Sequence, residues 1–195
     1  MDINELLKNA ICTNNLDLLI SLRENYSIDE RFEDENNDTL LLYSISDGKS
    51  DIYKYFLENG ANIKCVNDEN ENILHAICFS GDKSRLIDII KKYPDININA
   101  RSSDGATPLL LSLSLGYYEM AEIFIRNGAD VNIGDIDEVS PLHIAVQFGN
   151  LDLVKLLIEN GAILKKKTAN GNYPLALAVN AENIDIVKYI YELMY

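Results

Sequence analysis

Residues 140–162 read SPLHIAVQFGNLDLVKLLIENGA, and versions of this stretch recur along the whole chain of 195 residues. Its spacing is set by a series of leucines separated by 34, 33, 35, 33 and 33 residues: Leu7, Leu41, Leu74, Leu109, Leu142 and Leu175. The acidic residue Asp152 recurs in every copy except the third, where Ser84 takes its place. A step near 33 residues, sustained over the chain, predicts an array of stacked repeats.

Each copy carries the signals of two short helices joined by a tight turn. Thr107 and Ser140 suit the N-cap of the first helix, and a proline follows each of them at the first helical turn, where a missing N–H costs nothing. The second helix, such as residues 151–160, has apolar residues at helical spacing and ends before a glycine. The turn between the helices falls on residue types that tolerate positive φ: Asn14, Gly48, Gly81, Gly116 and Gly149.

The pattern is broken at four places. Glu182 replaces the turn glycine in the last copy, and Glu138 replaces a glycine in the segment that links two copies. Tyr173 stands where a capping Ser or Thr belongs. The third copy is two residues longer around residues 91–98, which predicts an extended second helix or linking segment.

The chain resembles the ankyrin-repeat family, which has a 33-residue period and a Thr-Pro-Leu-His-x-Ala signature. Residues 107–109 and 140–143 match that signature best, and residues 73–75 keep part of it. The resemblance covers essentially the whole chain. It implies a single all-α domain over residues 1–195, a solenoid of about six helix-turn-helix repeats with projecting hairpin fingers. We expect the repeats at 1–33 (an N-terminal cap), 34–66, 67–101, 102–134, 135–167 and 168–195 (a C-terminal cap).

Charge and composition limit the partners of such a domain. The chain carries 17 basic and 31 acidic side chains, a formal charge of −14, which repels nucleic acid and anionic membranes and favours partners with basic patches. We expect no signal peptide and no membrane helix, because no basic-then-apolar start and no long apolar run occur. Cys12, Cys65 and Cys78 form no CxxC motif, which is typical of reduced thiols, so we expect a cytoplasmic protein.

Candidate catalytic and metal-binding groups are few. The only histidines, His75 and His143, share one position of the repeat, which implies a stacking role in which the imidazole bonds a neighbouring hydroxyl or loop backbone. No third ligand with zinc spacing lies near either histidine, and no Gly-rich phosphate loop is present. With both histidines structural, no base remains for nucleophilic catalysis. We therefore predict no enzyme activity, no cofactor and no metal site.

Residues 165–167 form the one basic run, Lys165-Lys166-Lys167. We expect a solvated loop that balances local acidic residues. The run is too short for nucleic-acid binding in so acidic a chain.

The fingers of the second and third repeats are acidic, with six acidic residues against one arginine in residues 29–38. In the ankyrin family the finger tips and inner helices form a concave face that usually binds partners, so the resemblance implies a binding surface there. Its apolar members would form a strip rimmed by charge, which is typical of interfaces. The alternative interpretation is that the acidic fingers only keep the chain solvated. The predicted partner-binding residues are Glu35, Asn36, Asp38, Asp47, Asp68, Glu69, Glu71, Phe79, Ser103, Asp104, Leu115, Ile136, Asp137, Gln147 and Phe148.

The sequence therefore predicts a non-catalytic module that binds another protein with a basic surface. A small immunity or inhibitor protein that neutralises a toxin or enzyme, a bacterial or viral effector that targets host proteins, and a scaffold all stay open. The last helix, within residues 186–195, is apolar on most sides. One helical stripe cannot bury all of these side chains, so we predict an exposed apolar patch and a monomer or weak self-association through this helix.

Overall fold

The computed structural model describes residues 2–33, 36–46, 48 and 51–195. Within these residues the regular secondary structure is helical, and the only β contact is an isolated bridge between Arg31 and Thr39. The predicted all-α class is confirmed. In chain order the helices are α1 (Ile3–Cys12), α2 (Leu16–Ser21), the 3-10 helix η1 (Arg23–Asn25), α3 (Leu40–Ser46), α4 (Ile52–Glu58), α5 (Ile73–Ser80), α6 (Lys83–Lys92), α7 (Pro108–Ser114), α8 (Tyr118–Arg126), α9 (Pro141–Gln147), α10 (Leu151–Glu159), α11 (Pro174–Asn180) and α12 (Ile184–Met194).

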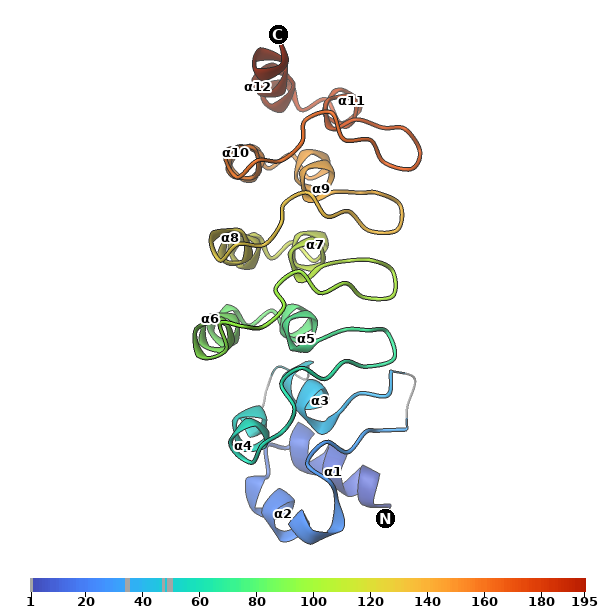
Figure 1. The fold of residues 1–195 in the computed structure, drawn as a ribbon, viewed down its shortest axis with the longest axis vertical. Helices are drawn as coiled ribbons and strands as arrows, with labels where there is room; N and C mark the ends of the chain where they lie inside the picture. Colours follow the sequence, from blue (N-terminus) through green and yellow to red (C-terminus); the bar gives the residue numbers. More distant parts are fainter. Residues whose placement is uncertain (1, 34–35, 47, 49–50) are drawn as a thin grey trace. The chain divides into compact units, whose positions relative to one another are not determined.

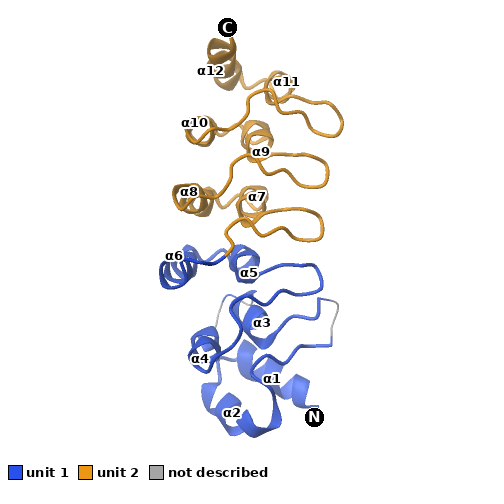
Figure 2. Ribbon diagram, in the orientation of Figure 1, with its two compact units in different colours: residues 1–96 blue, residues 97–195 orange. Residues whose placement is uncertain are grey.

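The helices fall into two compact units, residues 1–96 and residues 97–195, which we call the N-terminal and C-terminal units (Figure 2). In the N-terminal unit α1 packs on α2, α3 on α4 and α5 on α6, and the inner helices α3 and α5 also pack on each other. In the C-terminal unit α7 pairs with α8, α9 with α10 and α11 with α12, while the inner helices α7, α9 and α11 pack in sequence (Figure 1). The assignment of all residues to one domain stays a prediction.

The helix pairs form where the sequence places caps and turns. The Thr107 hydroxyl accepts a hydrogen bond from the Leu110 N–H at 3.2 Å, which satisfies one of the free donors at the start of α7. Tyr173 caps α11 without any side-chain hydrogen bond, as its residue type predicts. The two non-glycine turn residues, Asn14 and Glu182, have φ angles of 52° and 56°, so the turn geometry is kept even where the glycine is absent.

The longer third repeat is confirmed in the second helix of its pair. α6 spans 10 residues, one more than α8 or α10, and the second extra residue lies in the loop that follows. The helix ends at Lys92 because Pro94 disfavours helical dihedral angles at Tyr93, whose φ and ψ are −127° and 72°.

The core of each unit is built from the repeated apolar positions. The leucine that sets the repeat step is buried in the first five repeats and half-buried in the last. Burying such a side chain contributes about 1.5–3 kcal/mol, so the repeats within each unit contribute to a shared core. Within the described residues, no helix is long and apolar enough to cross a membrane.

Candidate functional site

Hairpin fingers between the helix pairs carry most of the predicted binding residues. The finger of the third repeat, which we call the third finger, is closed by a backbone hydrogen bond from the Asn67 N–H to the Glu71 carbonyl at 3.1 Å. It is tied to the finger of the second repeat, the second finger, by a bond from the Asp68 N–H to the Asn36 carbonyl at 3.0 Å. These bonds fix the backbone from which the acidic side chains project.

The same arrangement recurs in the C-terminal unit. The Ile136 N–H donates to the Asp104 carbonyl at 3.0 Å, and the Ala169 N–H donates to the Asp137 carbonyl at 2.7 Å. Successive fingers within this unit are therefore linked tip to tip by backbone hydrogen bonds. Figure 1 draws these fingers as the loops that project beside the inner helices.

A pocket of about 270 Å³ lies between the fingers and the inner helices of the N-terminal unit. The fingers supply polar side chains, while α3 and α5 supply an apolar floor and an aromatic side chain, Phe79, that is 46% exposed. A charged rim next to exposed apolar surface is the usual composition of a binding site. The pocket is lined by Asn36, Asp38, Leu42, Ser46, Asn67, Glu69, Glu71, Asn72, Ala76 and Phe79.

The carboxylates of this pocket are held in place by a buried amide. Asn67 is only 6% exposed, and its side-chain nitrogen donates to Asp38 Oδ1 at 2.9 Å and to Glu71 Oε2 at 2.8 Å. Its side-chain oxygen accepts from the Glu71 N–H at 2.9 Å. One amide therefore fixes two negative groups from neighbouring fingers beside each other, which concentrates negative potential at this end of the pocket.

The structure brings together five of the predicted site residues in this pocket, namely Asn36, Asp38, Glu69, Glu71 and Phe79. Asp68 is exposed but does not line the pocket, because its carboxylate accepts from the Asn37 side chain at 3.0 Å along the finger. The predictions for Glu35 and Asp47 lie outside the described residues.

The predicted residues of the C-terminal unit are all exposed, on fingers and at the ends of inner helices. Ile136, at 69% exposure, and Asp137 lie on a finger. Phe148, at 53% exposure, follows α9 directly, and its ring makes an edge contact with Tyr118 at a centroid distance of 6.4 Å. The others are Ser103 and Asp104 on a finger and Leu115 and Gln147 at the ends of α7 and α9.

Sequence reasoning missed several residues that shape the pocket, above all Asn67, Asn72, Leu42 and Ala76. A signal for Asn67 was present, because a short polar residue recurs at the first hairpin position of later fingers as Ser102, Asp135 and Thr168. Leu42 and Ala76 carry no such signal, because they follow ordinary apolar positions of the inner helices.

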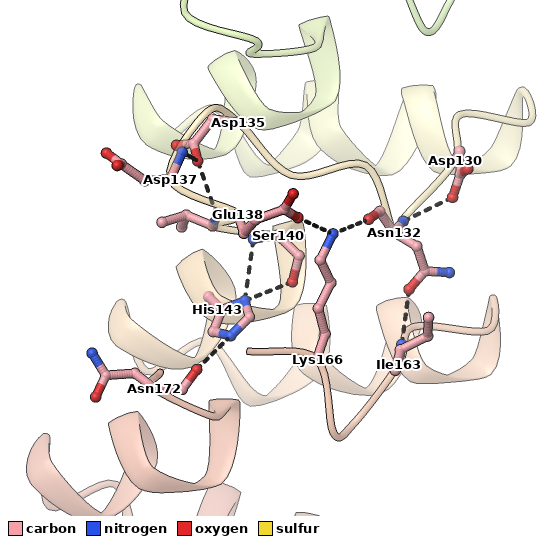
Figure 3. Close-up of polar contacts among 11 residues, drawn as sticks. Asp130, Asn132, Asp135, Asp137, Glu138, Ser140, His143, Ile163, Lys166 and Asn172 are labelled. Atoms are coloured by element: carbon pink, nitrogen blue, oxygen red, sulfur yellow. Dashed lines mark hydrogen bonds and ion pairs between the residues drawn. The ribbon is translucent and has the colours of Figure 1, made fainter. Parts of the chain in front are cut away.

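His143 has the structural role that its repeat position implies (Figure 3). Its Nδ1 accepts from the Ser140 N–H at 3.1 Å and lies 2.7 Å from the Ser140 hydroxyl, while Nε2 lies 3.2 Å from the Asn172 carbonyl. A carbonyl can only accept, so Nε2 carries the proton and the ring is neutral. Burial lowers the pKa of His143 below its ordinary value, which favours the same neutral form.

His75 closes the equivalent cap in the N-terminal unit. It is fully buried, and its Nδ1 accepts from the Asn72 N–H at 3.2 Å and lies 2.9 Å from Asn72 Oδ1. Both histidines thus join the start of an inner helix to the residue that caps it.

The lysine run was expected to be a solvated loop that balances local acidic residues, and Lys166 does pair with the acidic Glu138, but its solvation needs a correction (Figure 3). This side chain is only 20% exposed, and its Nζ donates to the Asn132 carbonyl at 2.8 Å and pairs with Glu138 Oε2 at 3.1 Å. It turns inward because the hairpin places an otherwise open carbonyl and a carboxylate within its reach. Lys165 and Lys167 are exposed as expected.

Thiol and metal chemistry find little support. Burial raises the pKa of the Cys65 and Cys78 thiols, which keeps both in the unreactive protonated form. Among the residues that the structure describes, no group of three or more His, Cys, Asp or Glu side chains could hold a metal ion.

Helix pairs that recur at a step near 33 residues and are linked by hairpin fingers define an all-α repeat protein of the solenoid class. Residues 59–135 and 127–194 match the family described as ankyrin repeats (3 copies). The chain belongs to the ankyrin-repeat family. Ankyrin repeats generally mediate protein–protein interaction.

The proteins similar to this chain differ widely from one another. The chain is 32% identical over 76 residues to delta-latroinsectotoxin-Lt1a of Latrodectus tredecimguttatus, covering 39% of this chain and 6% of the toxin. It is 31% identical over 98 residues to the Neurogenic locus Notch protein of Drosophila melanogaster, covering 50% of this chain and 4% of the Notch protein. It is 29% identical over 99 residues to phosphocholine transferase AnkX of Legionella pneumophila, covering 50% of this chain and 10% of the transferase. The match spans about a tenth or less of each relative.

Proposed function

We propose that this chain is a non-catalytic protein-binding module that grips a partner with a basic surface on its acidic concave face. The observation that carries the proposal is the pocket of the N-terminal unit, where Asp38, Glu69 and Glu71 rim an apolar floor beside the exposed ring of Phe79. Carboxylates on neighbouring fingers attract and orient a basic partner, while an exposed aromatic side chain supplies apolar contact area.

The alternative, that these acidic residues only solvate the fingers, accounts less well for their arrangement. Solvating side chains gain nothing from fixed positions, yet Asp38 and Glu71 are both held by the buried Asn67 amide. Ordering a long side chain such as glutamate costs up to about 2 kcal/mol of rotamer entropy, a cost that preorganised binding groups avoid when the partner arrives.

The biological role depends on the partner. The same surface serves an immunity or inhibitor protein, an effector that targets host proteins, or a scaffold. The names of the relatives, a toxin, a Notch protein and a transferase, are too varied to choose among these roles. We further propose that the module works in the cytoplasm.

We also propose that the module is a monomer or self-associates weakly through α12. Tyr191, Leu193 and Tyr195 are exposed on this helix and its end, and the rings of Tyr191 and Tyr195 lie 4.8 Å apart. Analytical ultracentrifugation at high concentration should show association in the parent that Tyr191→Glu weakens. A strictly monomeric parent contradicts the association.

Selection of peptides from a random displayed library tests the proposed function without a known partner. We expect peptides selected on the parent chain to be enriched in Arg and Lys. They should bind Glu69→Gln more weakly, yet bind Asp88→Asn as tightly as the parent, because Asp88 is also an exposed acid but lies on α6, outside this pocket. No enrichment in basic residues, or an equal loss in both variants, would refute the proposal.

A further inference from the structure

The pocket of the N-terminal unit has an unusual aromatic wall. Phe79 lies at a position of the repeat that is polar in the neighbouring copies, where the counterparts are Ser46, Ser114 and Gln147. Packing does not require an aromatic side chain here, because Phe79 is 46% exposed. The third repeat therefore presents apolar surface to solvent at a place where the fold accepts a small polar residue.

The charged and aromatic parts of the pocket lie at opposite ends of α5. Asn72, the N-cap of α5, lines the pocket at the finger end, beside the carboxylates that Asn67 holds. Phe79 lies seven residues further along, about 10 Å away at the rise of an α-helix. Ala76, between them, and Leu42 of α3 form an apolar floor.

We propose that this pocket binds one arginine side chain of the partner. The aliphatic stem lies along Leu42 and Ala76 against the ring of Phe79, and the guanidinium meets the carboxylates at the finger end. This inference rests on the proposed function and names the side chain that the acidic surface recognises. A long side chain with an apolar stem and a cationic head matches a pocket that is apolar at one end and acidic at the other.

Arginine fits the acidic end better than lysine. Asp38 comes from the second finger and Glu71 from the third, and both contact the same Asn67 nitrogen, so two carboxylates converge on one place. A guanidinium presents five donors in a planar fork and can bridge two such groups, whereas an ammonium is a compact and strongly hydrated point charge. A carboxylate offers about four lone-pair sites, so it can accept from Asn67 and from a guanidinium together.

The experiment is an NMR titration of the isotope-labelled full chain with single blocked amino acids. The probes are the N-acetyl methylamides of arginine, lysine, citrulline and norleucine, of which citrulline keeps the shape of arginine without its charge. We expect arginine to shift the Asn67 side-chain amide and the Ala76 and Phe79 backbone amides. It should bind about tenfold or more tightly than lysine or citrulline.

Two variants separate the two ends of the pocket. Glu69→Gln should reduce the preference for arginine over citrulline, while Phe79→Ala should weaken arginine, citrulline and norleucine to a similar extent. Asp88→Asn, an exposed acid elsewhere on the N-terminal unit, should change neither property and reports on general charge effects.

Each outcome decides between the two proposals. Equal shifts and equal affinities for arginine and lysine would overturn the arginine assignment and leave the basic partner in place. Arginine shifts that lie outside the pocket, or no shifts at millimolar probe, would overturn the assignment as well. If the displayed peptides also lack basic residues, the proposed function fails with it.

Discussion

Arg85 is a buried charge at a position that is apolar elsewhere in the array. Its counterparts in the next two repeats are Met120 and Leu153, yet Arg85 is only 6% exposed. Its two terminal nitrogens donate to the carbonyls of Ile45 and Gly48, each at 3.0 Å. The guanidinium therefore satisfies carbonyls at the end of α3, where helices leave acceptors without partners.

We predict that Arg85→Met destabilises the chain by about 2 kcal/mol. Methionine restores most of the packing, as Met120 does in the fourth repeat, but it removes the guanidinium bond to the buried Ile45 carbonyl, which keeps the Gly48 N–H as a donor at 3.1 Å. A hydrogen bond from a charged donor contributes about 1.5–3 kcal/mol. The Gly48 carbonyl is partly exposed, so water can replace its bond at a cost of about 1 kcal/mol or less. The relief of guanidinium desolvation offsets part of these losses.

The partner of Arg85 on its own helix does not add to this cost. Asp82 Oδ2 lies 3.2 Å from Arg85 Nε, but the Asp82 side chain is 33% exposed. Asp82 also keeps its role as N-cap of α6, where it accepts from the Ser84 N–H at 2.9 Å. Arg85→Lys should fall between the parent and Arg85→Met, because one ammonium cannot reproduce the fork that reaches both carbonyls.

Urea unfolding followed by circular dichroism measures these differences, and amide hydrogen exchange shows whether the loss is centred on α3 and α6. The matched control is Arg126→Met. Arg126 has a 67% exposed side chain that lies 3.9 Å from Glu122, so its loss should change stability by less than about 0.5 kcal/mol. If Arg85→Met is as stable as the parent or more so, desolvation outweighs the carbonyl bonds and the reasoning is wrong.

Three further changes test other parts of the molecule. Glu182 has a φ of 56°, a strained value for a side chain, so Glu182→Gly should stabilise the chain by about 1 kcal/mol. Thermal unfolding checks this, and a melting temperature that does not rise contradicts it. Burial lowers the pKa of His143 below its ordinary 6.5, so the unfolded chain binds a proton first as the pH falls. The free energy of unfolding should therefore decrease from about pH 6.5 downward, and His143→Leu should reduce this slope in urea titrations at several pH values; equal slopes would refute the assignment. Once a partner is identified, Glu69→Lys should mainly slow association, in a salt-dependent way, while Phe79→Ala should mainly speed dissociation. Surface-plasmon kinetics at two ionic strengths separate the two effects, and a uniform change in both rate constants would contradict them.

The repeat step made most of the fold predictable. The positive φ angles of Asn14, Glu138 and Glu182 follow from their register alone, because each stands where another copy has a glycine. The role of His143 followed in the same way. These features depend only on the position of the residue within its repeat, and that position can be assigned by comparing several copies.

Features that depend on one particular neighbour were not predictable. The inward turn of Lys166 requires the Asn132 carbonyl and Glu138 to lie within reach, and the bonds of Arg85 require the carbonyls of Ile45 and Gly48 to lie within reach. The repeat pattern shows what the copies share, so it does not reveal a contact that occurs in one copy alone. The candidate pocket was half predictable for the same reason, because the acidic fingers were visible in the sequence and the role of Asn67 between two of them was not.

Departures from the repeat divide into two kinds, and the division separates folding from binding. Arg85 and Glu138 depart from the pattern, and each meets a partner that the fold supplies, two carbonyls in one case and Lys166 in the other. Phe79 departs in the opposite sense, since it replaces a polar residue with an aromatic one and remains 46% exposed. A departure that the fold compensates is explained by stability, whereas an exposed aromatic side chain contributes little to the folded chain until another molecule covers it. Phe79 is therefore the residue on which a search for the partner surface should be centred.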